Sequence, residues 1–122
     1  MKQTLLIIED NHDLAESLTD ILEEEYLVTI AMSGKEGLEQ ALTLHPDLII
    51  LDIRMPDMNG YQVYQKLQAD TWGKGAKVLI LTASESLENI AKNINLPTEY
   101  ILFKPEVSVE ELRKKVSARL AE

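Results

Sequence analysis

The chain has 122 residues, of which 45% are hydrophobic and 27% charged, a balance that is typical of one globular domain and excludes a disordered chain. It has no cysteine, which excludes disulfide bonds and thiolate metal sites, and no apolar run approaches the roughly 20 residues of a membrane span. The net charge of −9 argues against direct nucleic-acid binding, because phosphate contacts need clustered Lys and Arg. The length predicts one domain over residues 1–122, and the lack of cysteine makes a cytoplasmic protein the expectation.

Three runs of consecutive apolar residues predict strands, at Leu5–Ile8, Leu48–Leu51 and Val78–Leu81. A continuous run is typical of a central strand in a parallel sheet that is covered on both faces. The segment Leu27–Ala31 includes a polar residue and predicts an edge strand, while Tyr100–Phe103 predicts a fifth strand.

Helices are expected between the strands. Apolar residues recur at helical spacing within residues 14–22, 87–94 and 109–120. Residues 61–69 predict a shorter helix that is entered through Asn59-Gly60.

Three helix starts carry the capping-box spacing, in which a Glu follows the capping residue by three positions. They are Asp13, Ser33 and Ser108, so we expect helices to begin near residues 13, 34 and 108. Five strands alternating with five helices imply βαβ units with right-handed crossovers. The sequence therefore predicts a doubly wound, flavodoxin-like α/β fold with a five-stranded parallel sheet, and we expect the common strand order 2-1-3-4-5.

Polar and charged residues follow four of these strands at the point where each strand ends. They are Glu9 and Asp10 after the first strand, Asp52 after the third, Thr82 after the fourth and Lys104 after the fifth. The carboxyl ends of parallel strands meet at one edge of a sheet, and open α/β sheets bind their ligands there. We therefore expect these five side chains to form one site.

The residue types at this edge suit phosphoryl chemistry. Three carboxylates that lie close together disfavour joint ionisation unless a cation is present. Mg²⁺ is the expected ion, because it takes one or two carboxylates, retains waters and accepts a phosphate oxygen. A carboxylate nucleophile with a metal, an ammonium group and a hydroxyl group is the equipment needed to accept a phosphoryl group.

The sequence resembles the receiver domain of two-component response regulators over essentially its whole length. The motifs that carry the resemblance stand in the family's order and spacing: Glu9-Asp10, Asp52 with Met55-Pro56 and Asn59-Gly60, Thr82-Ala83, and Lys104-Pro105.

The resemblance implies a phosphoacceptor and a metal site. Asp52 would take a phosphoryl group from a histidine kinase or a histidine phosphotransfer protein. Glu9, Asp10, Asp52 and the backbone carbonyl of Arg54 would bind Mg²⁺. By the same resemblance the domain is a regulatory module and not an enzyme, although it assists its own phosphorylation and dephosphorylation.

The resemblance also implies roles for the remaining motif residues. Lys104 and Thr82 would bind phosphoryl oxygens, and Ala83 would stay small so that phosphate and water can enter. The Lys104-Pro105 peptide bond would be cis. Phosphorylation would switch protein–protein interactions through the face formed by the fourth helix, the fifth strand and the fifth helix, toward an unknown output partner or an effector domain.

The chain departs from the family at the position three residues before the lysine. Receivers commonly carry an aromatic residue there, whereas this sequence has Ile101. Neighbours on a strand point to opposite faces, so the adjacent Tyr100 does not take its place. In the family, this aromatic side chain changes rotamer as the threonine moves toward the phosphate. Here a movement of Thr82 would have to shift the fourth helix and the fifth strand through other packing contacts.

Three alternatives compete with the receiver interpretation. An FMN-binding flavodoxin shares the predicted fold, but Glu9 and Asp10 would repel its phosphate. A haloacid-dehalogenase-type phosphatase typically has a second Asp two residues after its nucleophile, where this sequence has Arg54. A binding module that keeps the receiver fold and works without phosphorylation stays open, favoured by Ile101 and opposed by Asp52, Thr82 and Lys104.

Overall fold

A computed structural model describes residues 1–83, 87–104 and 108–122 of the chain. Its sheet has five strands, joined in parallel in the order β2-β1-β3-β4-β5. The strands are β1 (Thr4–Ile8), β2 (Leu27–Ala31), β3 (Leu48–Asp52), β4 (Val78–Thr82) and β5 (Ile101–Phe103). This confirms the predicted strands, the predicted edge position of β2 and the predicted strand order.

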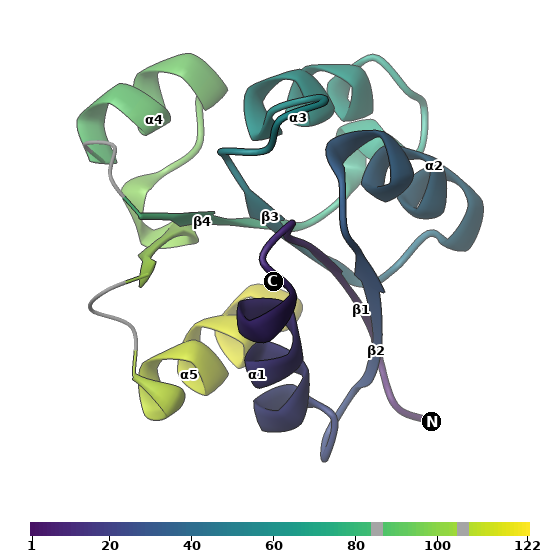
Figure 1. The fold of residues 1–122 in the computed structure, drawn as a ribbon, viewed down its shortest axis with the longest axis vertical. Coiled ribbons are helices and arrows are strands. Elements are labelled where there is room, and N and C mark those ends of the chain that lie inside the picture. The colour runs from purple at the N-terminus through teal and green to yellow at the C-terminus, as the bar shows by residue number, and fades with distance from the viewer. Residues whose placement is uncertain (84–86, 105–107) are drawn as a thin grey trace.

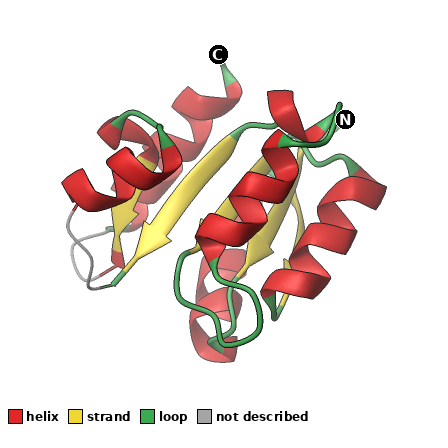
Figure 2. Cartoon of the chain, turned by 90° about the horizontal axis from the view of Figure 1, so that it is seen from above, coloured by secondary structure: helices red, strands yellow, loops and turns green. Residues whose placement is uncertain are grey.

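Five α-helices and two 3₁₀ turns connect the strands. The helices are α1 (His12–Leu22), α2 (Gly34–Leu44), α3 (Gly60–Gln68), α4 (Leu87–Ile94) and α5 (Val109–Leu120), and the turns are η1 (Gly73–Gly75) and η2 (Thr98–Tyr100). Helices α1 and α5 cover one face of the sheet, and α2, α3 and α4 cover the other (Figures 1 and 2). None of the helices in the described part of the chain is long and apolar enough to cross a membrane.

Two hydrophobic cores lie on the two faces of the sheet. Along β1, Leu6 and Ile8 pack toward α2, α3 and α4, while Leu5 and Ile7 pack toward α1 and α5. All four side chains are buried, as a strand with both faces covered requires. This packing fixes the sheet on both faces and leaves the carboxyl ends of its strands at one edge of the molecule.

The helix starts confirm two predicted caps and correct one. The hydroxyls of Ser33 and Ser108 accept hydrogen bonds from the amides three residues on, as predicted. Helix α1, however, is capped by Asn11, whose side chain accepts from the Leu14 amide at 3.1 Å. The prediction that Asp13 caps this helix is wrong, because Asn11 is an equally good cap and comes first. Asp13 lies in the first turn, where its negative charge interacts favourably with the positive end of the helix dipole.

Ile101, the first residue of β5, and Tyr100, the last residue of η2, point to opposite sides of the sheet, as predicted, although the strand begins one residue later than expected. Ile101 is buried in the core under α2, α3 and α4. Tyr100 packs against the core under α1 and α5, where the Arg119 guanidinium lies 4.0 Å from the centre of its ring. Its hydroxyl also donates a hydrogen bond to Glu122 of the same corner. Tyr100 therefore belongs to the α5 side and does not occupy the position of the family's aromatic residue.

Candidate functional site

The register of the sheet places the predicted site residues side by side at the carboxyl ends of the strands. Ile8 pairs with Leu51, so the residues that follow β1 and end β3 are neighbours. Thr82 pairs with Phe103, which brings the end of β4 beside Lys104. The four strand ends therefore converge, because their pairing fixes their position relative to one another.

Three carboxylates meet at this edge. Glu9 and Asp52 are buried, at 0% and 3% exposure, while Asp10 is exposed. One carboxylate oxygen from each of the three lies within 4.8 Å of the others. The Asn11 amide donates a hydrogen bond to Glu9 Oε2 at 3.2 Å. The group matches the metal ligands expected from the sequence, and its all-oxygen donor set fits a hard divalent cation such as Mg²⁺.

Lys104 joins two of these carboxylates. Its Nζ lies 2.6 Å from Glu9 Oε1 and 3.3 Å from Asp52 Oδ1, and its side chain is 20% exposed. The ammonium group therefore bridges the ends of β1 and β3 from the end of β5. One positive charge faces three negative ones, so the site is short of positive charge.

The pKa shifts follow from burial and from this imbalance of charge. Burial raises the pKa of Glu9, and the neighbouring Asp52 raises it further. Burial also raises the pKa of Asp10, together with the adjacent Glu9 carboxyl. For Lys104, burial alone would lower the pKa, but the contacts with Glu9 and Asp52 outweigh burial and the net shift is upward. The carboxyls of Glu9 and Asp10 therefore resist ionisation, and Lys104 is favoured in its charged form. An additional cation at the site would stabilise the ionised carboxylates.

Thr82 contributes a hydroxyl that is buried without a partner. The residue is 1% exposed, and Oγ1 has no hydrogen-bond partner among the described residues. Leaving a buried hydroxyl unpaired costs free energy, and such a group in a native protein calls for an explanation. A ligand oxygen at this edge would supply the missing partner. Ala83, the next residue, is exposed.

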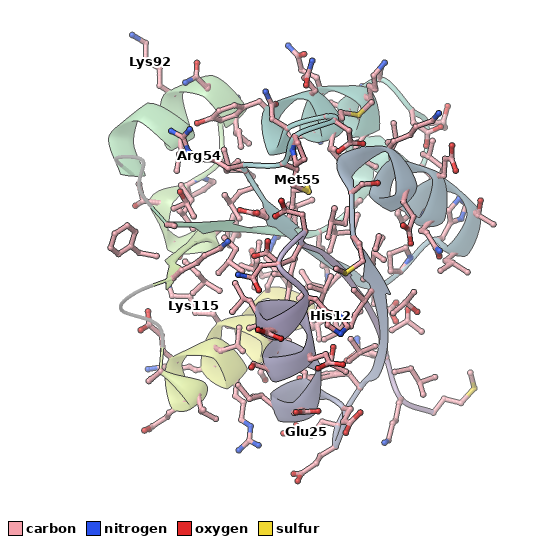
Figure 3. All side chains as sticks on the ribbon, in the orientation of Figure 1. His12, Glu25, Arg54, Met55, Lys92 and Lys115 are labelled. Carbon is pink, nitrogen blue, oxygen red and sulfur yellow. The ribbon has the colours of Figure 1, made fainter. Side chains whose placement is uncertain are left out.

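The loop between β3 and α3 closes tightly against the site. The Arg54 amide lies 3.4 Å from Asp52 Oδ1, and the Gly60 amide donates to the Ile53 carbonyl at 2.8 Å. A Cβ on Gly60 would lie 2.5 Å from the Asp52 carbonyl oxygen, so only glycine lets α3 begin here. Arg54 is exposed, whereas Met55 is 7% exposed and packs into the core (Figure 3).

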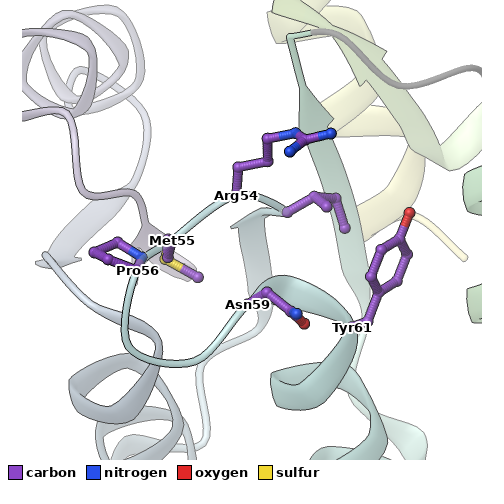
Figure 4. A pocket seen from close by; sticks show the side chains of 6 residues that line it. Arg54, Met55, Pro56, Asn59 and Tyr61 are labelled. Carbon is purple, nitrogen blue, oxygen red and sulfur yellow. The ribbon is translucent and has the colours of Figure 1, made fainter.

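A pocket of about 400 Å³ opens beside this loop (Figure 4). Its lining residues come from the loop and the first turn of α3: Ile53, Arg54, Met55, Pro56, Asn59 and Tyr61. The start of α3 is rigid, because Asn59 and Gln62 form a complete capping box. This box was not predicted from the sequence, although Asn59 and Gln62 have the capping-box spacing.

The structure thus brings Glu9, Asp52 and Lys104 into direct contact and places Asp10 and Thr82 at the same edge. The predicted cis bond before Pro105 lies outside the described residues. One residue was missed entirely by sequence reasoning. Asp57 accepts hydrogen bonds from the amides of residues 34 and 35, and no local pattern reveals a partner so distant in sequence.

Comparison with known proteins agrees with this geometry. The family model of the response regulator receiver domain matches residues 5–117. The chain belongs to this family. The match favours the receiver interpretation over the FMN-binding and dehalogenase-type alternatives, which share parts of the fold or the chemistry.

Two curated relatives of this receiver domain are transcriptional regulatory proteins. CiaR of Streptococcus pneumoniae is 36% identical over 116 residues, which are 95% of this chain and 50% of CiaR. CusR of Escherichia coli is 38% identical over 111 residues, which are 90% of this chain and 48% of CusR. The chain therefore spans about half the length of these relatives.

Solved receiver structures share the fold across the whole domain. A putative response regulator from Chloroflexus aurantiacus superposes with a TM-score of 0.87 at 30% identity, covering 100% of both chains. A CheY-like receiver domain protein from Methanospirillum hungatei has a TM-score of 0.86 at 29% identity, covering 99% of this chain and 95% of its own.

Proposed function

We propose that this receiver domain accepts a phosphoryl group on Asp52 from the phosphohistidine of a histidine kinase or a histidine phosphotransfer protein. The observation that carries the proposal is the contact of Lys104 with both Glu9 and Asp52, which joins the ends of three strands around one buried carboxylate. The membership in the receiver family supports the same chemistry.

In the proposed reaction an oxygen of the Asp52 carboxylate attacks the phosphorus. The new O–P bond forms as the P–N bond to the donor histidine breaks, and the electron pair of that bond returns to the imidazole. Lys104 Nζ, at 3.3 Å from Asp52 Oδ1, would neutralise charge on the phosphoryl oxygens. The buried Thr82 hydroxyl would donate the hydrogen bond that it lacks in the described residues.

Glu9, Asp10, Asp52 and the backbone carbonyl of Arg54 would hold Mg²⁺ at this site. The donor set supports the assignment, because each of the three side chains offers a carboxylate oxygen within 4.8 Å of the others. The ion would supply positive charge to the oxygens of the transferring phosphoryl group. Ala83, small and exposed beside Thr82, would leave an entrance for phosphate and water.

The proposed output is a change in protein–protein contacts at the face of α4, β5 and α5. The output partner is a separate protein or an effector domain, since the curated relatives are about twice as long. MtrA of Mycobacterium tuberculosis, a relative that is 33% identical, is named as a DNA-binding response regulator. For residues 1–122 we propose one regulatory domain without nucleic-acid contacts of its own, because its net charge is −9.

Intact-mass measurement after incubation with a small-molecule phosphodonor tests the proposal. A phosphoryl adduct should form with Mg²⁺, decrease strongly without it and be absent in Asp52→Asn. An adduct that persists in Asp52→Asn would place the phosphoryl group elsewhere. No adduct in the wild type would instead favour the alternative, a binding module on the receiver fold that works without phosphorylation.

A further inference from the structure

The tip of the loop between β3 and α3 is bound to the start of α2. Asp57 Oδ1 accepts a hydrogen bond from the Gly34 amide at 3.1 Å, and Oδ2 accepts one from the Lys35 amide at 3.0 Å. These are the first two amides of α2, which an α-helix leaves without internal partners. Ser33 accepts from the Glu36 amide of the same turn. A residue of the loop between β3 and α3 thus completes the cap of a helix that lies more than 20 residues earlier.

The charge of Asp57 suits this position. Its carboxylate lies at the positive end of the α2 dipole, where an anion is favoured. The hydrogen bond from the Lys35 amide is the main reason that the pKa of Asp57 is lowered, and the amides of Met58 and Gly34 act in the same direction. Asp57 therefore binds α2 as a charged group.

The backbones of the loop and α2 also touch directly. A Cβ on Gly34 would lie 2.0 Å from the Met58 carbonyl oxygen, a distance that no side chain tolerates. Met58 packs against the core under α2, α3 and α4. The contact thus has two independent parts, the Asp57 carboxylate and the absence of a side chain at Gly34, and each can be altered separately.

The loop is held at its base as well as at its tip. At the base, the Gly60 amide donates to the Ile53 carbonyl at 2.8 Å. At the tip, Asp57 is bound to α2. Arg54 lies between these two fixed points, directly after Ile53. The position of its carbonyl therefore depends on both attachments.

We propose that Asp57 is a positioning residue for the metal site. By binding the start of α2 it holds the loop so that the Arg54 carbonyl stays beside Asp52, and it thereby raises the affinity of the site for Mg²⁺. The inference rests on the proposed Mg²⁺ site. Loss of a residue that orients a metal ligand typically costs roughly 10–100-fold in affinity. Because Asp57 acts through one of four ligands, we expect a loss of roughly three- to tenfold.

A Mg²⁺ titration monitored by two-dimensional amide NMR tests this inference. The dissociation constant should rise roughly three- to tenfold in Asp57→Ala and also rise in Gly34→Ala, which disturbs the same contact from the other side. Asp57→Asn keeps one acceptor and should fall between Asp57→Ala and the wild type. The Gly34 and Lys35 amide signals should shift in Asp57→Ala even without Mg²⁺.

Two control variants separate positioning from general stability. Ser33→Ala weakens the cap of the same helix but leaves the Asp57 contacts in place. Asp47→Ala removes a carboxylate that accepts a hydrogen bond from the Thr4 amide at 2.8 Å, at the opposite end of the sheet. Both should lower the Tm, and neither should change the Mg²⁺ dissociation constant by more than about twofold, because the Arg54 carbonyl keeps its orientation.

The outcomes distinguish the inference from the function on which it rests. Equal Mg²⁺ affinity in the wild type and Asp57→Ala would overturn the positioning role and leave the metal site intact. An equal loss of affinity in Asp57→Ala and Ser33→Ala would also overturn it, because a weakened α2 would then be the cause. A wild type that binds no Mg²⁺ would overturn both the metal site and the inference.

Discussion

Asp52→Asn should make the metal-free domain more stable. The change removes one negative charge from a group of three carboxylates and one ammonium, and it keeps the shape of the side chain. The cost of the charge follows from the distances. At a separation of 4.8 Å, Asp52 repels Glu9 by ~3.5 kcal/mol at an effective dielectric constant of about 20, and it repels the exposed Asp10, which solvent screens, by up to the same amount.

The attraction to Lys104 opposes this repulsion without cancelling it. At 3.3 Å it is worth ~5 kcal/mol at the same dielectric constant. The net repulsion is therefore up to ~2 kcal/mol, and the cost of burying the Asp52 carboxylate adds to it. For a domain of this size, each kcal/mol of added stability corresponds to a rise in Tm of roughly 4 °C, so ~2 kcal/mol corresponds to roughly 8 °C.

Thermal unfolding in a chelating buffer measures the difference. Trp72 is the single tryptophan and lies away from the site, so its fluorescence reports unfolding and not the local change. Asp20→Asn on the exposed surface of α1 is the matched control, since it alters the net charge equally without touching the cluster. Its Tm should stay within about 2 °C of the wild type, as is usual for a surface substitution.

Addition of Mg²⁺ should then raise the Tm of the wild type more than that of Asp52→Asn, because the variant lacks one carboxylate of the proposed metal site. A metal-free Asp52→Asn variant with a Tm equal to or below that of the wild type would refute the reasoning. Lys104 would then compensate the three carboxylates fully.

Two further predictions concern pH and the far end of the sheet. Since the pKa values of Glu9 and Asp10 are raised by folding, the metal-free domain should lose stability as the pH rises from the ordinary carboxyl range through the raised values. Urea unfolding across this window should show the loss in the wild type, and a Glu9→Gln/Asp10→Asn variant that showed the same loss would contradict it. Mg²⁺ should change Trp72 fluorescence only weakly, because Trp72 stacks on His45, with 4.3 Å between ring centres, in a pocket away from the proposed metal ligands. Strong quenching in a Mg²⁺ titration would contradict this.

The strands and the convergence of the candidate site residues could be predicted from the sequence. The strands follow from the hydrophobic pattern, and the convergence follows from parallel pairing. Continuous apolar runs marked β1, β3 and β4, and the polar residue in Leu27–Ala31 marked the edge strand. Parallel pairing then required the residues after the strands to converge. Glu9, Asp52 and Lys104 do so, because residues at strand ends have their positions set by the sheet.

Contacts made by loop residues could not be predicted in the same way. Asp57 reads in the sequence as one more polar residue of a turn, and its partners become neighbours only when α2 packs beside the loop. The stacking of His45 on Trp72 is similar, since it joins two separate connections at the far end of the sheet. Asn11 and Asp13 are both adequate N-caps and lie two residues apart. Which of them caps α1 depends on where the chain enters the helix after β1, and the structure has Asn11 there.

The parallel order of the strands has a consequence for folding. Glu9 and Asp52 are 43 positions apart in the sequence, and Lys104 lies 95 positions after Glu9, so their contacts close long segments of chain and are slow to form. A folding intermediate that lacks β5 would hold the carboxylates without their ammonium partner. The docking of β5 therefore completes the sheet and also brings in the ammonium group that offsets part of the negative charge at its edge.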